Sequence, residues 1–298
     1  MIYGSRGEEV EHIQGRLLGR GYTLPRFGAD GDLGSETWTA LFNYAGDHGF
    51  AWREEDFEEE VGFVPAAVVN HLQCDAPRVE LRGASEFFDI TGEHALTKGR
   101  KAPRDHSTVD TILLHQTAVK FGTTRRNREK YGERKALHRR FYNVACHVAA
   151  LRNGDVLYVN RLPRYVWQGN VANRFSIGIE IEGHYSGIEG NPKTISGGKT
   201  PDVLDERTIE SARAAVRFAV EEGRRLGMPI TKIQAHRNYS GSRRNDPGES
   251  IWKAVALWAV PVLGLCVDHD VARNGGRPIP QEWDPAGLYD WRGDRLVR

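Results

Sequence analysis

Short apolar runs alternate with helical patterns along the C-terminal two thirds of the chain, and this alternation restricts the possible folds more than any other feature. The apolar runs predict strands at 109–115, 144–151, 155–160, 175–182 and 232–236. Helical spacing of apolar residues predicts helices at 128–142, 205–226 and 249–262. A basic, turn-rich stretch at 98–106 is predicted to be a loop. The pattern indicates an α/β (α+β) domain with a mixed central sheet flanked by helices.

The first 75 residues show a different pattern, which is typical of a small three-helix all-α domain. Val10, Ile13 and Leu17 recur at helical spacing, and the turn Asp30-Gly31-Asp32-Leu33-Gly34 precedes a second apolar helical face. A third helix is expected at 58–72. We therefore predict a helical domain at 1–75, a linker at 76–84, and a larger domain with a C-terminal extension at 85–298.

Composition excludes several classes of protein. The 298 residues contain 41 Lys and Arg against 40 Asp and Glu, so no strong overall field favours nucleic acid as a partner. No apolar run approaches the roughly 18 residues that a membrane-spanning helix needs, which predicts a soluble protein without membrane insertion. Three cysteines provide no disulfide framework. The first eight residues lack the basic start and apolar core of a signal peptide, so none is expected, and a monomer is the default.

A loop near the end of the larger domain carries His236 and Asp246, ten positions apart. A second imidazole, His115, closes the predicted strand at 109–115, and strand ends commonly carry functional residues. Two histidines and one aspartate match a three-ligand zinc site, whose open fourth position is typical of catalytic zinc. The alternative is purely structural: a hydrogen-bonded histidine, and Asp246 as the N-cap of a helix that starts at Pro247.

Six segments in a fixed order resemble the zinc-dependent N-acetylmuramoyl-L-alanine amidases, the type 2 amidase family that includes peptidoglycan recognition proteins. The segments are Thr111–Ala118, Val144–His147, Arg152–Val156, Trp167–Asn170, Ser176–Gly183 and the loop from His236 to Asp246. The resemblance covers about residues 85–265. The pattern from Gly4 to Leu41 resembles the three-helix peptidoglycan-binding domain of many wall hydrolases.

The resemblance implies a Zn²⁺ cofactor, with His115, His236 and Asp246 as metal ligands. It assigns the catalytic base to Glu180, while Glu182, on the same strand face, is the structural alternative. Many family members carry a lysine where this chain has Arg244, which keeps the positive charge for an oxyanion but does not donate a proton at neutral pH. The neighbouring Arg243 is an alternative for this role.

Further residues are candidates for contact with bacterial peptidoglycan, both glycan strand and stem peptide. In the larger domain they are His147, which either lines the substrate cleft or orients a polar network, and Trp167, whose alternative is a core position. In the N-terminal domain they are Asp30 and Gly31, with Trp38 or Phe27 nearby. Cys146 replaces a tyrosine found in several relatives. A Cys146–His147 catalytic dyad is disfavoured because adjacent strand residues point to opposite faces.

The resemblance implies an enzyme that cuts the amide between N-acetylmuramic acid and the first L-alanine of the stem peptide, and the residues themselves indicate hydrolysis by a zinc-activated water. A wall hydrolase without a signal peptide fits a phage or prophage endolysin that is made in the host cytoplasm and reaches the wall after release. A cytoplasmic recycling amidase and an effector exported by another system are the alternatives. The alternative is a non-catalytic peptidoglycan-binding protein, because some relatives bind without cutting.

Overall fold

The computed structural model describes residues 2–20, 22–47, 50, 64–73, 86–95, 98–187, 201–268, 271–284, 290–292 and 295–297. The chain divides into two compact units, one comprising Met1–Arg78 with Ile90–Ala95 and the other Val79–Asp89 with Leu96–Arg298. The linker predicted at 76–84 lies outside the described residues. None of the described helices has the length and apolar character that crossing a bilayer requires.

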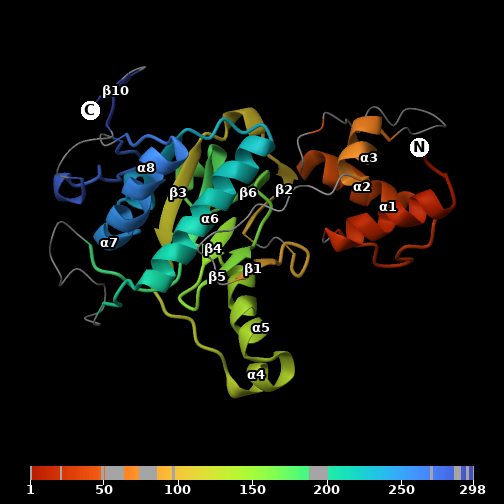
Figure 1. Ribbon diagram of the computed structural model, residues 1–298, viewed down its shortest axis with the longest axis horizontal. Coiled ribbons are helices and arrows are strands. Elements are labelled where there is room, and N and C mark those ends of the chain that lie inside the picture. Colours follow the sequence, from red (N-terminus) through yellow and green to blue (C-terminus); the bar gives the residue numbers. More distant parts are fainter. Residues whose placement is uncertain are drawn as a thin grey trace. The chain divides into compact units, whose positions relative to one another are not determined.

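Helices α1 (Glu8–Gly19), α2 (Ser35–Asp47) and α3 (Ala66–Gln73) form the first unit (Figure 1). Their core contains Ile13, Leu17, Leu41, Val68 and Leu72, none of which is exposed to solvent. The predicted all-α character of this region is therefore confirmed. Helix α3 begins at Ala66 rather than at 58, and residues 58–63 lie outside the described part of the chain.

The turn between α1 and α2 is fixed from within by the buried side chain of Gln14. Its Nε2 donates to Asp30 Oδ1 at 2.7 Å and to Thr37 Oγ1 at 2.8 Å, and its Oε1 accepts from the Gly31 N–H at 2.7 Å. Gly31 has a φ of 73°, a conformation that favours glycine. The turn residues of the sequence pattern therefore have a conformational role that burial and hydrogen bonding explain.

The second unit contains a six-stranded sheet in the order β1-β5-β4-β7-β3-β8. The strands are β1 (Glu86–Asp89), β5 (Asp155–Tyr158), β4 (Val148–Ala150), β7 (Ser176–Ile181), β3 (Thr111–Gln116) and β8 (Lys232–Ala235). Strand β3 lies parallel to both β7 and β8, and only the β4–β5 pair is antiparallel. The mixed α/β sheet predicted from the alternation is confirmed.

The two faces of this sheet differ in chemistry. On β3 and β7, the side chains of Ile112, Leu114, Ile177 and Ile179 belong to the main core, which α6 (Glu206–Arg225) contributes to with its buried face. Figure 1 shows α6 lying across the sheet. Because strand side chains alternate, His115 and Glu180 lie on the opposite face, and they are register partners on β3 and β7. Core packing on one face thus holds functional side chains on the other.

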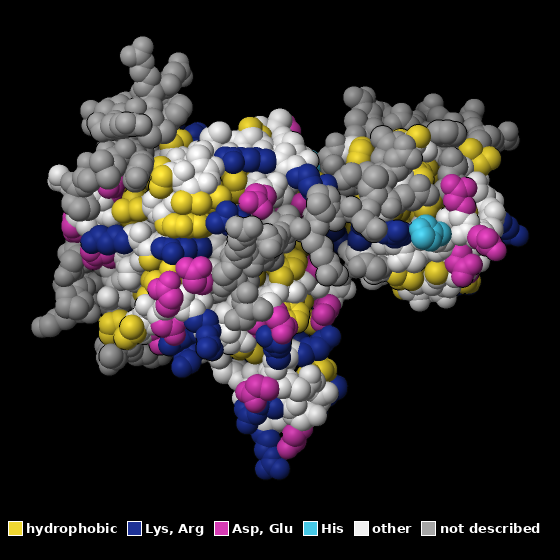
Figure 2. All heavy atoms as spheres, viewed as in Figure 1, with side chains coloured by type: hydrophobic (Ala, Val, Ile, Leu, Met, Phe, Trp, Pro, Cys, Tyr) yellow, Lys and Arg dark blue, Asp and Glu magenta, His cyan; other side chains and the backbone are white. Residues whose placement is uncertain are grey.

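The helices predicted at 249–262 and 128–142 are each divided into shorter elements. The predicted helix at 249–262 consists of α7 (Glu249–Ile251), a π-helical stretch η6 (Trp252–Ala256) and α8 (Leu257–Leu263). The predicted helix at 128–142 is broken at Gly132 into α4 (Arg125–Tyr131) and α5 (Glu133–His138). Figure 2 shows Lys and Arg side chains together with Asp and Glu side chains on this projecting α4–α5 arm. Short 3-10 helices are η2 (His106–Thr108), η3 (Arg139–Asn143), η4 (Asn170–Arg174), η5 (His236–Tyr239) and η7 (Gln281–Trp283).

One sequence-based expectation about this unit is wrong. Residues 98–106 are not wholly a loop, because β2 (Gly99–Pro103) pairs antiparallel with β6 (Arg164–Val166). The partner strand is more than sixty residues away, so local composition gives no signal for this pairing. A second small hairpin, β9 (Asp290–Arg292) with β10 (Arg295–Val297), lies near the C-terminus.

Candidate metal centre

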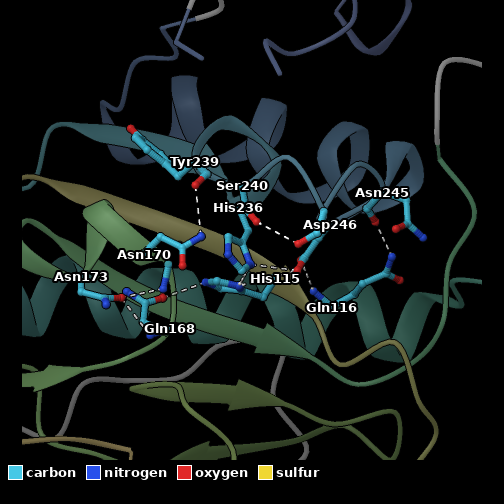
Figure 3. Close-up of polar contacts among 12 residues, drawn as sticks. His115, Gln116, Gln168, Asn170, Asn173, His236, Tyr239, Ser240, Asn245 and Asp246 are labelled. Carbon is cyan, nitrogen blue, oxygen red and sulfur yellow. Dashed lines mark hydrogen bonds and ion pairs between the residues drawn. The ribbon is translucent and has the colours of Figure 1, made fainter. Parts of the chain in front are cut away.

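Three side chains converge at the C-terminal end of the central strands (Figure 3). His115 comes from β3, His236 follows β8 directly, and Asp246 comes from the loop after η5. His236 Nδ1 lies 3.0 Å from His115 Nδ1 and 3.0 Å from Asp246 Oδ2, and His115 Nδ1 lies 4.0 Å from that oxygen. All three residues are buried.

This donor set fits a zinc ion. Bonds of about 2.0–2.1 Å in a tetrahedral site place ligand atoms about 3.3 Å apart, which the three separations bracket. Burial and the neighbouring His236 lower the pKa of His115 to about 3, so its ring is neutral and can act as a ligand. The pKa of Asp246 is raised by burial, but the hydrogen bond with His236 and further contacts outweigh this effect and lower it.

The orientation of the His115 ring is set by Gln168. Gln168 Oε1 lies 2.7 Å from His115 Nε2, and Gln168 Nε2 donates to Ser176 Oγ at 2.9 Å. Because the amide group of Gln168 is thereby oriented, its oxygen accepts a hydrogen bond from the His115 Nε2–H, and Nδ1 keeps the lone pair that a metal needs. A side chain at Gly178 would collide with this amide, since a Cβ there would lie 1.9 Å from Gln168 Oε1.

The Asp246 carboxylate is oriented toward the two histidines and does not cap a helix. Its Oδ1 accepts from the Gln116 N–H at 2.9 Å, which leaves Oδ2 directed at the histidines. The predicted N-cap role is wrong, because the following helix begins at Glu249 and its N-cap residue is Gly248. The backbone of Gln116, next to a ligand on β3, thus fixes a ligand 130 residues further along the chain.

Glu180 lies beside this cluster with an unsatisfied carboxylate. Its Oε2 is buried and has no hydrogen-bond partner among the described residues. Burial and the charge of Asp246 raise the pKa of Glu180 well above its ordinary value, and the charge of Arg243 opposes them. A carboxylate with a raised pKa beside a metal centre is suited to accept and release a proton.

Glu182, two positions later, has a different environment. Its two carboxylate oxygens accept from the Phe121 N–H at 2.9 Å and the Arg152 N–H at 3.1 Å. Burial raises its pKa, and these backbone hydrogen bonds oppose the shift. Both carboxylate oxygens of Glu182 therefore bind backbone groups of neighbouring loops. These contacts agree with the structural role that was the alternative for Glu182.

His147 does not line an open cleft. It is fully buried, its Nδ1 accepts from the Gly178 N–H at 3.0 Å, and its Nε2 lies 3.0 Å from the Arg164 carbonyl oxygen. Both ring nitrogens are engaged by backbone groups, so the expected contact with substrate is corrected to the alternative role in a polar network. The same bonds leave no ring nitrogen for the thiol of Cys146, whose pKa is raised by burial.

Arg243 and Arg244 are both exposed, and they lie in the loop between His236 and Asp246. The Arg244 carbonyl oxygen accepts from Arg237 Nη1 at 2.8 Å. Arg243 is the cation whose charge acts on His115 and Glu180, in each case lowering the pKa. The charge of Arg243 therefore reaches both His115 and Glu180.

The aromatic residues predicted to contact peptidoglycan differ in their exposure to solvent. Trp167 is 55% exposed, so it is not a core residue, and it directly precedes Gln168. In the first unit, Trp38 is only 4% exposed and belongs to the core, which removes it as a contact residue, whereas Phe27 is 59% exposed. Gly31 is buried in its turn, while Asp30 is exposed and retains the predicted contact role.

Several residues that support the centre have no role that a sequence pattern predicts. Gln168 and Gln116 were part of the recognised segments but carried no assignment. Arg104 is another: its buried guanidinium donates to the carbonyl oxygens of Asn173, Ser176 and Leu162 at 2.6–2.9 Å. Burial lowers the pKa of Arg104 to about 9. A buried arginine bound to backbone carbonyls has no recognisable sequence signal.

Several solved structures align with more than half of this chain at low sequence identity. An endolysin N-acetylmuramoyl-L-alanine amidase, LysCS, from Clostridium intestinale aligns with 61% of this chain and 97% of its own, at 14% identity and a TM-score of 0.35. Drosophila peptidoglycan recognition protein SD aligns with 57% of this chain and 91% of its own, at 17% identity and a TM-score of 0.36. Bumblebee PGRP-SA aligns with 58% and 92%, at 12% identity and a TM-score of 0.38. No curated protein matches the chain.

The sequence profile of the N-acetylmuramoyl-L-alanine amidases matches residues 105–249. The matched stretch contains β3, β7 and β8, the three converging residues and Glu180. This match identifies residues 105–249 as a domain of the N-acetylmuramoyl-L-alanine amidase type.

Proposed function

We propose that this protein hydrolyses the amide between the lactyl group of N-acetylmuramic acid and the first L-alanine of the stem peptide, with Zn²⁺ held by His115, His236 and Asp246. One observation carries the proposal: three buried donor atoms converge within 4.0 Å of one another beside a buried carboxylate oxygen that has no partner among the described residues. Non-catalytic binding of peptidoglycan would require neither the donor cluster nor the unsatisfied Glu180.

Hydrolysis of an amide requires a nucleophilic water, a polarised carbonyl and a proton for the leaving amine. When bound, zinc supplies Lewis acidity, which activates water near neutral pH and polarises the carbonyl. Glu180 takes the proton of the attacking water on Oε2, the oxygen without a partner. Its raised pKa lets it hold that proton until the leaving amine needs it.

Glu180 also provides a proton donor for the leaving amine, a role that neither arginine fits. Arginine does not release its proton at neutral pH, so neither Arg243 nor Arg244 serves as the acid. We assign protonation of the leaving amine to Glu180 Oε2 and electrostatic stabilisation of the developing oxyanion to Arg243, whose charge already acts on Glu180. Arg244 is the second candidate for that stabilising charge.

The predicted contacts with the substrate and the wall form part of the same proposal. Trp167, exposed next to the residue that orients His115, would pack against the sugar of the substrate. The helical unit would bind the wall, with Asp30 and Phe27 as exposed contact residues. The biological setting proposed is a phage or prophage endolysin that is made in the host cytoplasm and reaches the wall after release.

Mass spectrometry of digested sacculi tests this function. The protein should release peptides with free L-alanine amino ends, stop doing so after treatment with a chelator, and recover with added zinc. His236→Ala should lose both metal and activity. Release of reducing sugar ends instead of peptides would identify a glycosidase, and binding without any released product would identify a silent binder. Either result would refute the amidase proposal.

A further inference from the structure

Beyond the stretch that matches the family, residues 271–284 pack against the loop that carries two of the proposed ligands. We call 271–284 the strap and 236–246 the ligand loop. Two backbone hydrogen bonds join them, from the Arg273 N–H to the Asn238 carbonyl at 2.7 Å and from the Arg277 N–H to the Arg237 carbonyl at 2.8 Å. The strap therefore extends the scaffold of the ligand loop to a part of the chain that lies outside residues 105–249.

The side chain of Asn238 connects the strap to the start of the ligand loop. It is fully buried, and its Nδ2 donates to the carbonyl oxygens of Val271 at 2.9 Å and Arg277 at 3.1 Å. Its Oδ1 accepts from the N–H of Ala235, the residue before His236, at 2.9 Å. One side chain thus fixes the position of the strand end that presents His236.

Arg237 connects the strap to the other end of the ligand loop. Its guanidinium lies 4.7 Å from the ring centre of Trp283, a residue of the strap that is fully buried from solvent. Its Nη1 donates to the Arg244 carbonyl at 2.8 Å, and its backbone N–H donates to the Asp246 carbonyl at 2.9 Å. The position of Asp246 relative to His236 therefore depends on a residue that the strap holds in place.

The fit between strap and loop leaves no room for a side chain at its closest point. A Cβ at Gly276 would lie 2.3 Å from the Asn238 carbonyl oxygen and 2.7 Å from that of Arg237. Both atoms belong to the backbone, so they move only if the loop itself moves. Gly241 meets the same limit from the other side, because a Cβ there would lie 2.7 Å from the Gly275 carbonyl oxygen.

We propose that the strap is a positioning element of the metal centre: by holding Arg237 and Asn238, it sets the spacing of His236 and Asp246 and thereby the affinity for zinc. This inference rests on the proposed metal centre. Residues that orient metal ligands from behind typically change affinity by about tenfold to a hundredfold when altered. The strap supports two of the three proposed ligands, His236 and Asp246, in this way.

The test compares full-length variants. Gly276→Ala pushes on the ligand loop, and Gly122→Ala is its control, because a Cβ at Gly122 meets nothing within 4 Å. Trp283→Leu removes the ring under Arg237, and Trp283→Phe retains one. Metal-free protein is titrated with Zn²⁺ in competition with a chromophoric chelator and with Co²⁺ followed by its absorption bands, and circular dichroism measures the folded fraction.

We expect Gly276→Ala to bind Zn²⁺ about tenfold or more weakly and to change the Co²⁺ spectrum, with Gly122→Ala unchanged. Trp283→Leu should weaken binding, and Trp283→Phe should restore most of it. If Gly276→Ala folds and has the zinc affinity and Co²⁺ spectrum of the wild-type protein, the positioning role of the strap is overturned. If Gly276→Ala does not fold, equal zinc affinities of Trp283→Leu and Trp283→Phe would overturn that role. Failure of the wild-type protein to bind either metal would overturn the metal centre itself.

Discussion

Replacing Glu180 with glutamine should abolish hydrolysis and at the same time stabilise the metal-free protein. The buried Oε2 of Glu180 lacks a partner among the described residues, and the charge of Asp246 repels it. An unsatisfied buried polar group costs about 1–3 kcal/mol, and a charged one costs more. A neutral amide of the same shape removes the charge, so we expect a gain of about 1–3 kcal/mol in the free energy of unfolding.

Glu182→Gln is the matched control, with the opposite sign expected. Both of its oxygens accept from backbone N–H groups, so an amide NH₂ at either position would face another donor. The variant should lose about 1–3 kcal/mol of stability. For a domain of this size, each kcal/mol moves the melting temperature by about 2–4 °C. The two variants should therefore melt on opposite sides of the wild-type protein, although the substitutions are chemically identical.

The assay is thermal unfolding of the metal-free proteins at pH 8, followed by circular dichroism, together with release of peptides from sacculi by the zinc-loaded proteins. The pKa of Glu180 is raised on folding, so its charge destabilises the protein only above the unfolded value of about 4.3. The gain from Glu180→Gln should therefore shrink as the pH falls toward about 4. A melting temperature at or below that of the wild-type protein at pH 8 would refute the reasoning, and full activity would refute the catalytic role.

Three further predictions concern other parts of the molecule. Gly178→Ala should displace the amide of Gln168, since a Cβ would lie 1.9 Å from its oxygen, and should weaken zinc binding about tenfold or more in a chelator competition; unchanged affinity would contradict the orienting role of Gln168. Burial raises the pKa of Asp155, but hydrogen bonds led by that from Arg134 outweigh it and lower the pKa, so the stability that this carboxylate adds is present above about pH 4 and is lost as the pH falls through the folded value. Arg134→Met should therefore move acid unfolding, followed by circular dichroism, to higher pH, and superimposable curves would argue against this pair. Deletion of residues 1–75 should reduce co-sedimentation with sacculi while hydrolysis of a small muropeptide continues, and undiminished co-sedimentation would reject a wall-binding role for the helical unit.

Sequence patterns predicted the elements whose stability comes from a continuous apolar face. The helix expected at 205–226 is α6 at Glu206–Arg225, because its apolar residues recur at helical spacing and pack on the sheet. The strands at the centre of the sheet were likewise predicted, since burial on both faces gives β3 a nearly continuous apolar run. Signals of this kind lie within the element itself.

Features that depend on distant partners could not be predicted in this way. Strand β2 exists because it pairs with β6, and its own basic residues resemble a loop. Gln168 and Asn238 have no sequence signal for their roles, because each acts through a hydrogen bond to a residue that only the fold brings near. The proposed metal ligands could be predicted because histidine and aspartate are among the few residue types that bind zinc. An amide that supports them is one of many glutamines and asparagines.

The separation of the proposed ligands along the chain has a consequence for folding. His115 and His236 are 121 residues apart, yet their ring nitrogens lie 3.0 Å from each other. An ion bound between them would act as a reversible cross-link that closes a loop of more than one hundred residues, which restricts the unfolded chain far more than the folded one. The centre cannot assemble until the chain has been synthesised beyond Asp246, so a nascent protein would lack hydrolytic activity until nearly the whole catalytic unit had been made.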